Sequence, residues 1–159
     1  IPPHAQLLDD VINKLVNTPT WFGVRQIATI AHGMGKMKIN DDRFFRQVVL
    51  QSERIAKDAK EQELSNIVWA CASAGFKSAA LFDAVAGEWQ RICDKGNMQD
   101  LSNIIWAFGK AGHKSEVLFN AVAGEHLRIS ADERGQVSER SQRAFWKTIN
   151  INDATHYEN

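Results

Sequence analysis

Hydrophobic residues recur along this chain at the spacing of buried helical faces. In residues 61–74, four apolar residues lie at positions i, i+3, i+4 and i+7: Leu64, Ile67, Val68 and Cys71. After a short polar break, a second face follows, made by Leu81, Val85, Trp89 and Ile92. This spacing is typical of amphipathic helices, and no strand-like alternation of any length competes with it. The pattern predicts two helices, A and then B, joined by a turn.

The helix pair repeats every 37 residues without gaps. The sequence LSNIVWA at 64–70 returns as LSNIIWA at 101–107, and LFDAVAGE at 81–88 returns as LFNAVAGE at 118–125. The same step backwards from Leu81 reaches Phe44 and then Leu7. A fixed period of this size is typical of stacked supersecondary units. The predicted fold is therefore all-α, an α-solenoid of stacked helix-turn-helix repeats with a 37-residue period.

The helix boundaries recur in the same register. Gly75 and Gly112 are expected to end helix A. N-caps of helix B are expected at equivalent positions, at Asp41, Ser78 and Ser115. Asn97 and Asp100 have the spacing of a capping box that opens the next helix A. Gly87 and Gly124 lie within helix B and predict the close approach of a neighbouring helix.

These boundaries divide the chain into one helical-repeat domain, 1–149, and a polar tail, 150–159. Within the domain we expect a half unit at 1–18, helix pairs at about 24–56, 61–94 and 98–130, and a degenerate or truncated helix at 138–149. The mixed charge and the glycine of residues 134–143 predict an exposed connection. Because the chain starts at Ile1 and not at Met, a targeting peptide or further repeats are expected upstream.

Composition narrows the function classes only slightly. The hydrophobic share of 44% among 159 residues is typical of a folded protein, and the 19 basic and 19 acidic side chains cancel. Cys71 and Cys93 occupy non-equivalent repeat positions, which favours buried, reduced thiols over a disulfide. No apolar run is long enough to span a bilayer.

No motif in the sequence indicates catalysis. The five histidines lack metal-ligand spacing, and no P-loop, GxGxxG after a strand or GxSxG elbow is present. Gly33 and Gly35 are better explained as small residues on helix A than as a phosphate loop. The sequence therefore predicts a protein that is not an enzyme and that needs no cofactor or metal.

A polar stripe on helix A is the candidate binding surface. A helical wheel places positions 62, 66 and 73 and their repeat equivalents on one face, and we call these nine residues the stripe: Arg25, Thr29, Lys36, Gln62, Asn66, Ser73, Gln99, Asn103 and Lys110. Amides and hydroxyls can bond base edges, and Lys or Arg can neutralise phosphate. The alternative is an ordinary solvated helix face that binds nothing.

Two further rows of residues have a structural and a functional interpretation. Trp69 and Trp106 could stack on unpaired bases, although packing between units is favoured because apolar residues flank both. Arg54, Arg91 and Arg128 could form a basic ladder. Intrahelical pairing is favoured, because Glu88 and Glu125 precede two of them by three residues.

The repeated LSNIxWA and LFxAVAxE segments resemble the octotricopeptide repeats and the related 37-residue heptatricopeptide repeats of organellar RNA-binding proteins, many of which carry a RAP domain. The resemblance is strong over 61–129 and weaker over 24–55, where His32 replaces the tryptophan and Ala28-Thr29 replaces Ser-Asn. No RAP domain is visible. The resemblance implies an α-solenoid that binds single-stranded RNA or rRNA in a mitochondrion or plastid, with the stripe as the RNA-binding face.

Three functions remain open from the sequence. The first is an organellar RNA-binding module that supports RNA stability, processing, translation or ribosome structure. The second is a protein-interaction scaffold, since helical-repeat arrays often hold another polypeptide. The third is an accessory subunit of a large ribonucleoprotein. About three helix pairs would read only about three bases, which favours a longer array or an embedded subunit.

Overall fold

The structure is a computed structural model, and it describes residues 2–134 of the chain. Within these residues the secondary structure is helical throughout, in agreement with the predicted all-α class. The elements run in this order: α1 Pro3–Asn17, η1 Pro19–Trp21, α2 Val24–Met37, α3 Asp42–Leu50, α4 Ser52–Asp58, α5 Glu61–Ser73, α6 Ala79–Gly87, α7 Trp89–Lys95, α8 Met98–Ala111 and α9 Glu116–Arg134. The predicted helix at 138–149 and tail at 150–159 lie outside the described residues, as does most of 134–143.

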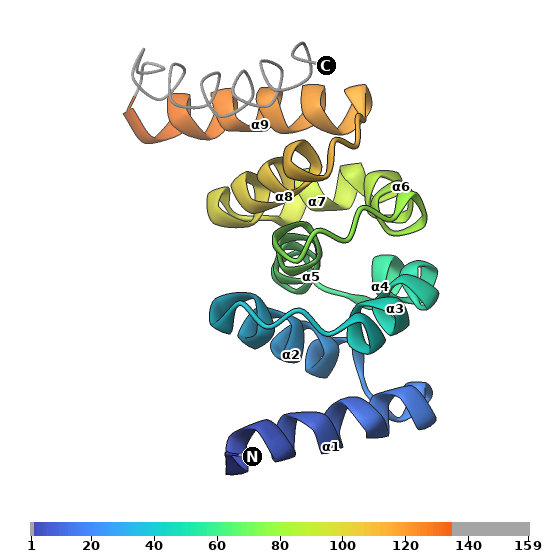
Figure 1. The fold of residues 1–159 in the computed structure, drawn as a ribbon. Coiled ribbons are helices and arrows are strands. Elements are labelled where there is room, and N and C mark those ends of the chain that lie inside the picture. The colour runs from blue at the N-terminus through green and yellow to red at the C-terminus, as the bar shows by residue number, and fades with distance from the viewer. Residues whose placement is uncertain (1, 135–159) are drawn as a thin grey trace, which may run out of the picture.

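The helices are arranged in two layers (Figure 1). One layer, the helix A layer, consists of α2, α5 and α8, and α5 lies between the other two in the most extensive helix–helix contacts of the structure. The other layer, the helix B layer, consists of α1, α3 with α4, α6 with α7, and α9, which follow one another in contact. Each predicted helix pair therefore contributes one helix to each layer.

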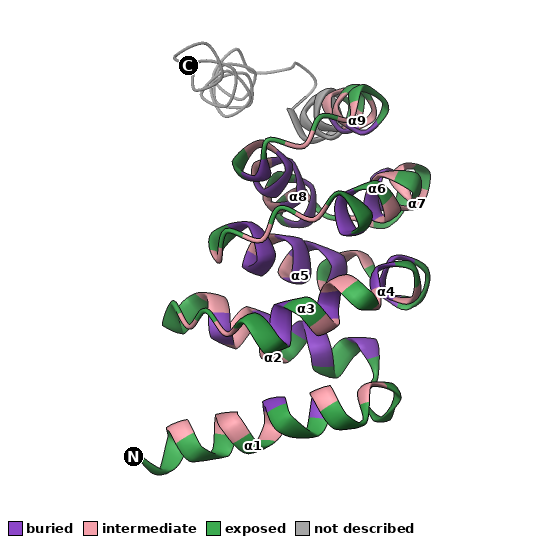
Figure 2. Cartoon of the chain, turned by 45° about the vertical axis from the view of Figure 1, so that its right-hand side comes forward, coloured by how far each residue is buried: buried purple, intermediate pink, exposed green. Residues whose placement is uncertain are grey.

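The hydrophobic core runs continuously through the stack. The predicted face of α5 is buried, as is the equivalent face of α8, which is made by Leu101, Ile104, Ile105 and Phe108. Buried residues occupy long stretches of α5 and α8 in Figure 2, whereas α1 is largely exposed. The core also contains Phe44, Phe45 and Phe82 from the helix B layer. Burial of these apolar faces, mainly between neighbouring helices of one layer and also between the layers, is what holds the helices in place.

The predicted N-caps are all present. The Asp41 carboxylate accepts hydrogen bonds from the amides of Arg43 and Phe44 at 2.9 and 3.4 Å. The Ser78 and Ser115 hydroxyls each accept a bond from the amide three residues on, at 3.4 Å. Asn97 and Asp100 form the predicted reciprocal capping box, with bonds of 2.8 and 3.2 Å. Cap residues were readable from sequence because each satisfies backbone amides that the helix itself leaves unpaired.

Helix A ends in the left-handed conformation in all three pairs. Gly75 and Gly112 have φ of 80° and 67°, as predicted for residues that stop a helix. Lys38, at the equivalent position of the first pair, has φ of 56° and is the only non-glycine with positive φ among the described residues. A side chain with a Cβ is strained there, at a cost of about 1–2 kcal/mol.

Helix B is interrupted in the first two pairs, contrary to the predicted single helix, whereas α9 of the third pair is continuous. It divides into α3 and α4 at Gln51 and into α6 and α7 at Glu88, where ψ is 17° at both residues. The Glu88 amide bonds the Val85 carbonyl at 3.0 Å, so the last turn of α6 tightens to i−3 bonding. Periodicity does not detect such a break, because the apolar spacing continues across it. Trp89, next to the break, is only half-buried.

The predicted role of Gly87 and Gly124 is wrong. A Cβ built on either glycine would meet nothing within 4 Å, so no neighbouring helix requires a glycine there. Leu50 occupies the same repeat position in the first pair and is 76% exposed. Recurrence of a residue type in a repeat therefore did not indicate steric contact at this position.

Replacing Lys38 by glycine is expected to raise the free energy of unfolding by about 1 kcal/mol, because glycine adopts positive φ without a steric penalty. Gly75→Ala, the reverse change at the equivalent position, is expected to lower it by a similar amount. Urea unfolding followed by circular dichroism measures both changes. Equal stability of Lys38→Gly and the parent chain would contradict the strain argument.

Candidate functional site

The stripe residues all lie at the surface of the helix A layer. Seven of them are exposed, and Asn66 and Asn103 are half-buried. They occupy equivalent positions on α2, α5 and α8, which lie side by side in that order. None of the nine is buried in the apolar core, so each is accessible to a partner on this face.

Internal hydrogen bonds occupy part of the stripe. The Gln99 amide donates to Asn103 Oδ1 at 2.9 Å. The Thr29 hydroxyl donates to the Arg25 carbonyl at 2.9 Å, as threonine often does within a helix. Asn66 makes no side-chain hydrogen bond among the described residues, so both its donor and its acceptor groups are available. Gln62 on the same helix makes none either, so both stripe amides of the central helix are unoccupied among the described residues.

Trp69 fills the contact between α5 and α2. A Cβ on Gly35 would lie 2.5 Å from Cζ3 of Trp69, so the indole occupies the space that glycine leaves open. The Trp69 ring lies 5.8 Å from the His32 ring, and Lys36 Nζ lies 5.9 Å from the indole centroid. The packing interpretation of this tryptophan is thus supported, although one part of the ring stays accessible beside the stripe.

At the equivalent contact between α5 and α8, an alanine stands where α2 has a glycine, which adds one carbon atom, the Cβ. Ala72 occupies the position of Gly35 and is buried, while Trp106 occupies the position of Trp69 and is half-buried. In the first pair His32 replaces the tryptophan, and its Nδ1 is buried without a hydrogen-bond partner among the described residues. Of the three equivalent ring positions, His32, Trp69 and Trp106, the first therefore carries a polar ring.

Arg54 and Arg91 bind backbone carbonyls between helices. Arg54 donates to the Phe22 carbonyl and Arg91 to the Ala59 carbonyl, both at 2.7 Å. Phe22 and Ala59 precede α2 and α5 at equivalent repeat positions, so each arginine joins helix B to the start of helix A in its own pair. Sequence reasoning found the arginines but missed the carbonyls, because backbone acceptors leave no mark in a sequence.

Arg91 has further partners that neutralise its charge. It bonds the Ala56 carbonyl at 2.6 Å, Glu61 at 2.8 Å and Glu88 at 3.1 Å. The predicted intrahelical pair with Glu88 is therefore present, as is the pair of Arg128 with Glu125. The geometry supports the structural interpretation of the arginine row, and these guanidinium groups do not form a free basic ladder.

The two cysteines are free and buried, as predicted. Burial raises the pKa of the Cys71 thiol to about 12. Burial also raises the pKa of Cys93, with the nearby Glu125 and Asp94 carboxylates adding to the effect. Burial therefore favours the neutral thiol form of both cysteines, which is the less reactive one.

The described residues contain neither a metal-binding cluster nor a membrane-spanning helix. Between residues 2 and 134, no group of three or more His, Cys, Asp or Glu is placed to hold a metal ion. Within the same residues, no helix is long and apolar enough to cross a membrane.

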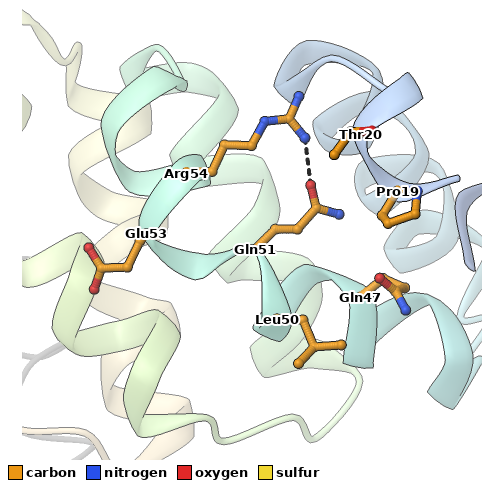
Figure 3. Close-up of a pocket in the computed structure, with 7 residues that line it drawn as sticks. All are labelled: Pro19, Thr20, Gln47, Leu50, Gln51, Glu53 and Arg54. Atoms are coloured by element: carbon orange, nitrogen blue, oxygen red, sulfur yellow. Dashed lines mark hydrogen bonds between the residues drawn. The ribbon is translucent and has the colours of Figure 1, made fainter.

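An open concavity lies on the helix B side of the stack (Figure 3). Its lining combines η1 with the α3–α4 break: Pro19, Thr20, Gln47, Leu50, Gln51, Glu53 and Arg54. The Arg54 guanidinium there already bonds the Gln51 side chain and the Phe22 carbonyl. The concavity contains no stripe residue, so the two surfaces are separate.

Comparison of the chain with protein-family models, with curated proteins and with solved structures finds no match.

Gly33 and Gly35 give a matched test of the Trp69 contact, because both lie in α2 but only Gly35 faces the indole. Gly33→Ala is expected to raise the free energy of unfolding by about 1 kcal/mol through helix propensity. Gly35→Ala is expected to lower it by about 1 kcal/mol, because overpacking costs more than propensity returns. Denaturant unfolding followed by tryptophan fluorescence distinguishes the two. Stabilisation by both changes would contradict the tight contact.

Arg91→Met is expected to lower the free energy of unfolding by about 2–3 kcal/mol, since it leaves two carbonyls and two carboxylates without their charged donor. Arg46→Met is the control, at an exposed arginine of α3 without an ion pair among the described residues. The control should change stability by no more than about 0.5 kcal/mol. Thermal and urea unfolding measure the difference, and equal effects of the two changes would argue against the carbonyl contacts.

Proposed function

We propose that this chain is an α-solenoid of 37-residue helical hairpins that binds single-stranded or ribosomal RNA in an organelle. The stripe on α2, α5 and α8 is the proposed binding face. The observation that carries the proposal is the alignment of nine accessible polar side chains on three adjacent helices. The resemblance to octotricopeptide and heptatricopeptide repeats supports the choice of RNA and the organellar location.

The chemistry of the stripe fits a single strand. Gln62, Asn66 and Gln99 provide amides that both donate and accept hydrogen bonds, which is what base edges require. Arg25, Lys36 and Lys110 provide charge for phosphate, and no stripe position is acidic. The chain as a whole is neutral, with 19 basic and 19 acidic residues, whereas the stripe contains three basic residues and no acidic one. A solvated face without a partner does not require this excess of basic residues.

The proposed role is binding and not catalysis. Three helix pairs would read only about three bases, which is a small target for a protein acting alone. We therefore propose that the chain works within a longer array or as a subunit of a ribonucleoprotein particle. RNA stability, processing, translation and ribosome structure are the processes that such a module supports.

A protein-interaction scaffold is the second candidate, and a separate observation favours it. Leu50 is 76% exposed at the concavity of Figure 3, on the helix B layer. Exposed leucine beside a partly apolar hollow is suited to another polypeptide. Binding at this surface would be insensitive to salt, whereas binding of RNA at the stripe would be strongly salt-dependent.

Alanine at Arg25, Lys36 and Lys110 is expected to weaken RNA binding by about tenfold or more, and to reduce its salt dependence. The slope of log K against log salt should fall by about 2, since each phosphate contact on a single strand contributes about 0.7. Fluorescence anisotropy with a labelled poly(U) oligonucleotide measures both quantities over a salt series.

The matched control replaces Arg46, Lys57 and Lys95 by alanine, three exposed cations outside the stripe. It removes the same charge and should leave the slope nearly unchanged. Equal losses in both variants would show that overall charge matters and the stripe does not. Absence of any RNA binding by the parent chain would reject the proposed function itself.

A further inference from the structure

The connections from helix A to helix B carry a row of lysines outside the stripe. The three connecting segments after the helix A ends read KIN at 38–40, GFK at 75–77 and GHK at 112–114. Each segment contains one lysine, and we call Lys38, Lys77 and Lys114 the turn lysines. All three are exposed, and none forms an ion pair among the described residues. No acidic residue occurs in any of the segments.

The three connections lie next to one another along one edge of the stack. In Figure 2 they follow each other from bottom to top on the same side of the molecule. Asn40 in the first connection donates to the Ala74 carbonyl at the end of α5, at 3.0 Å. His113 in the third connection bonds Asp83 of α6 at 2.8 Å. These contacts link each pair to the next, so the turn lysines form a row parallel to the order of the stripe helices.

The opposite edge, where helix B leads into the next helix A, has a different charge pattern. It carries three exposed lysines as well: Lys57, Lys60 and Lys95. Each of these has a carboxylate as its neighbour in the chain, since Asp58 follows Lys57, Glu61 follows Lys60 and Asp94 precedes Lys95. The turn lysines therefore differ from these three in having no acidic neighbour in the chain.

Helix stabilisation does not account for Lys77 and Lys114. Cations stabilise a helix C-terminus only within its last turn. Lys77 lies four positions beyond Ser73, the last residue of α5, and Lys114 lies three beyond Ala111, the last residue of α8. Lys36 and Lys110 lie in last turns and Lys38 caps the end of α2, so their charge has a structural use that Lys77 and Lys114 lack.

We propose that the turn lysines bind the phosphate backbone of the RNA strand, which runs along this edge from one repeat to the next while its bases face the amides of the stripe. This inference rests on the proposed function and assigns the orientation of the strand across the helix A layer. Lysine suits the backbone because its ammonium is a mobile point charge without the planar geometry that reads a base. Lys36 and Lys110 of the stripe precede Lys38 and Lys114 by two and four residues in the chain.

The acidic groups nearest to this edge form no ion pair with the turn lysines among the described residues. Asp41 bonds Arg43, and Asp83 bonds His113. Asp42 and Glu116 lie in the first turns of α3 and α9, where a negative charge stabilises the helix.

The test compares two triple variants that remove equal charge. One replaces Lys38, Lys77 and Lys114 by glutamine, and the other replaces Lys57, Lys60 and Lys95 by glutamine. All six positions are exposed, and circular dichroism checks that both variants keep the helical content of the parent. Affinity for labelled poly(U), and separately for poly-glutamate, is measured by anisotropy over a salt series.

The turn variant is expected to bind poly(U) about tenfold or more weakly, with the salt slope reduced by about 2, while the control variant stays near the parent. Equal effects of the two variants, with poly(U) binding by the parent intact, would overturn the strand orientation and leave the proposed function standing. No poly(U) binding by the parent would overturn both. Binding of poly-glutamate alone, lost in the turn variant, would assign the edge to an acidic protein partner and overturn the RNA assignment.

Discussion

Close packing of α5 between α2 and α8 is the interaction on which the rest of the structure depends. It requires a small residue on one helix opposite a large aromatic residue on the next, as Gly35 and Trp69 show. Helices in such contact lie about 8–10 Å apart, so equivalent side chains on successive helices are held at a regular short spacing. Every row described here, polar, aromatic or cationic, exists because this contact repeats.

The helix B layer is held to the helix A layer partly by hydrogen bonds from arginine side chains. Its helices are broken at Gln51 and Glu88, and its arginines reach across to carbonyls at the start of helix A. A guanidinium group can bond several oxygens in one plane, which makes arginine suitable for joining two chain segments at once. The two layers are thus connected by apolar burial in the middle and by charged hydrogen bonds at one edge.

The sequence predicted those features whose cause is local. Apolar spacing gave the buried faces of α5 and α8, and side-chain chemistry gave the caps at Asp41, Ser78, Ser115 and Asn97. The missed features depend on backbone geometry or on partners far along the chain: the break at Glu88, the left-handed Lys38 and the carbonyl partners of Arg91. The prediction for Gly87 is wrong for a further reason, because a residue can recur in a repeat without contacting a neighbouring helix. The stripe was predicted as an accessible face, and its accessibility agrees with the structure, while its ligand stays a proposal.

The hydrogen bonds from Arg54 and Arg91 to backbone carbonyls affect how charge is distributed over the molecule. Arg91 lies beside the Glu61 and Glu88 carboxylates, whereas Arg54 bonds a carbonyl and an amide, so the sum of charges in the sequence does not describe how they are distributed in space. A neutral molecule whose unpaired cations and carboxylates occupy different faces has a dipole moment. Such a molecule rotates in the field of an approaching polyanion before the two touch, and more of their collisions then occur in the productive orientation.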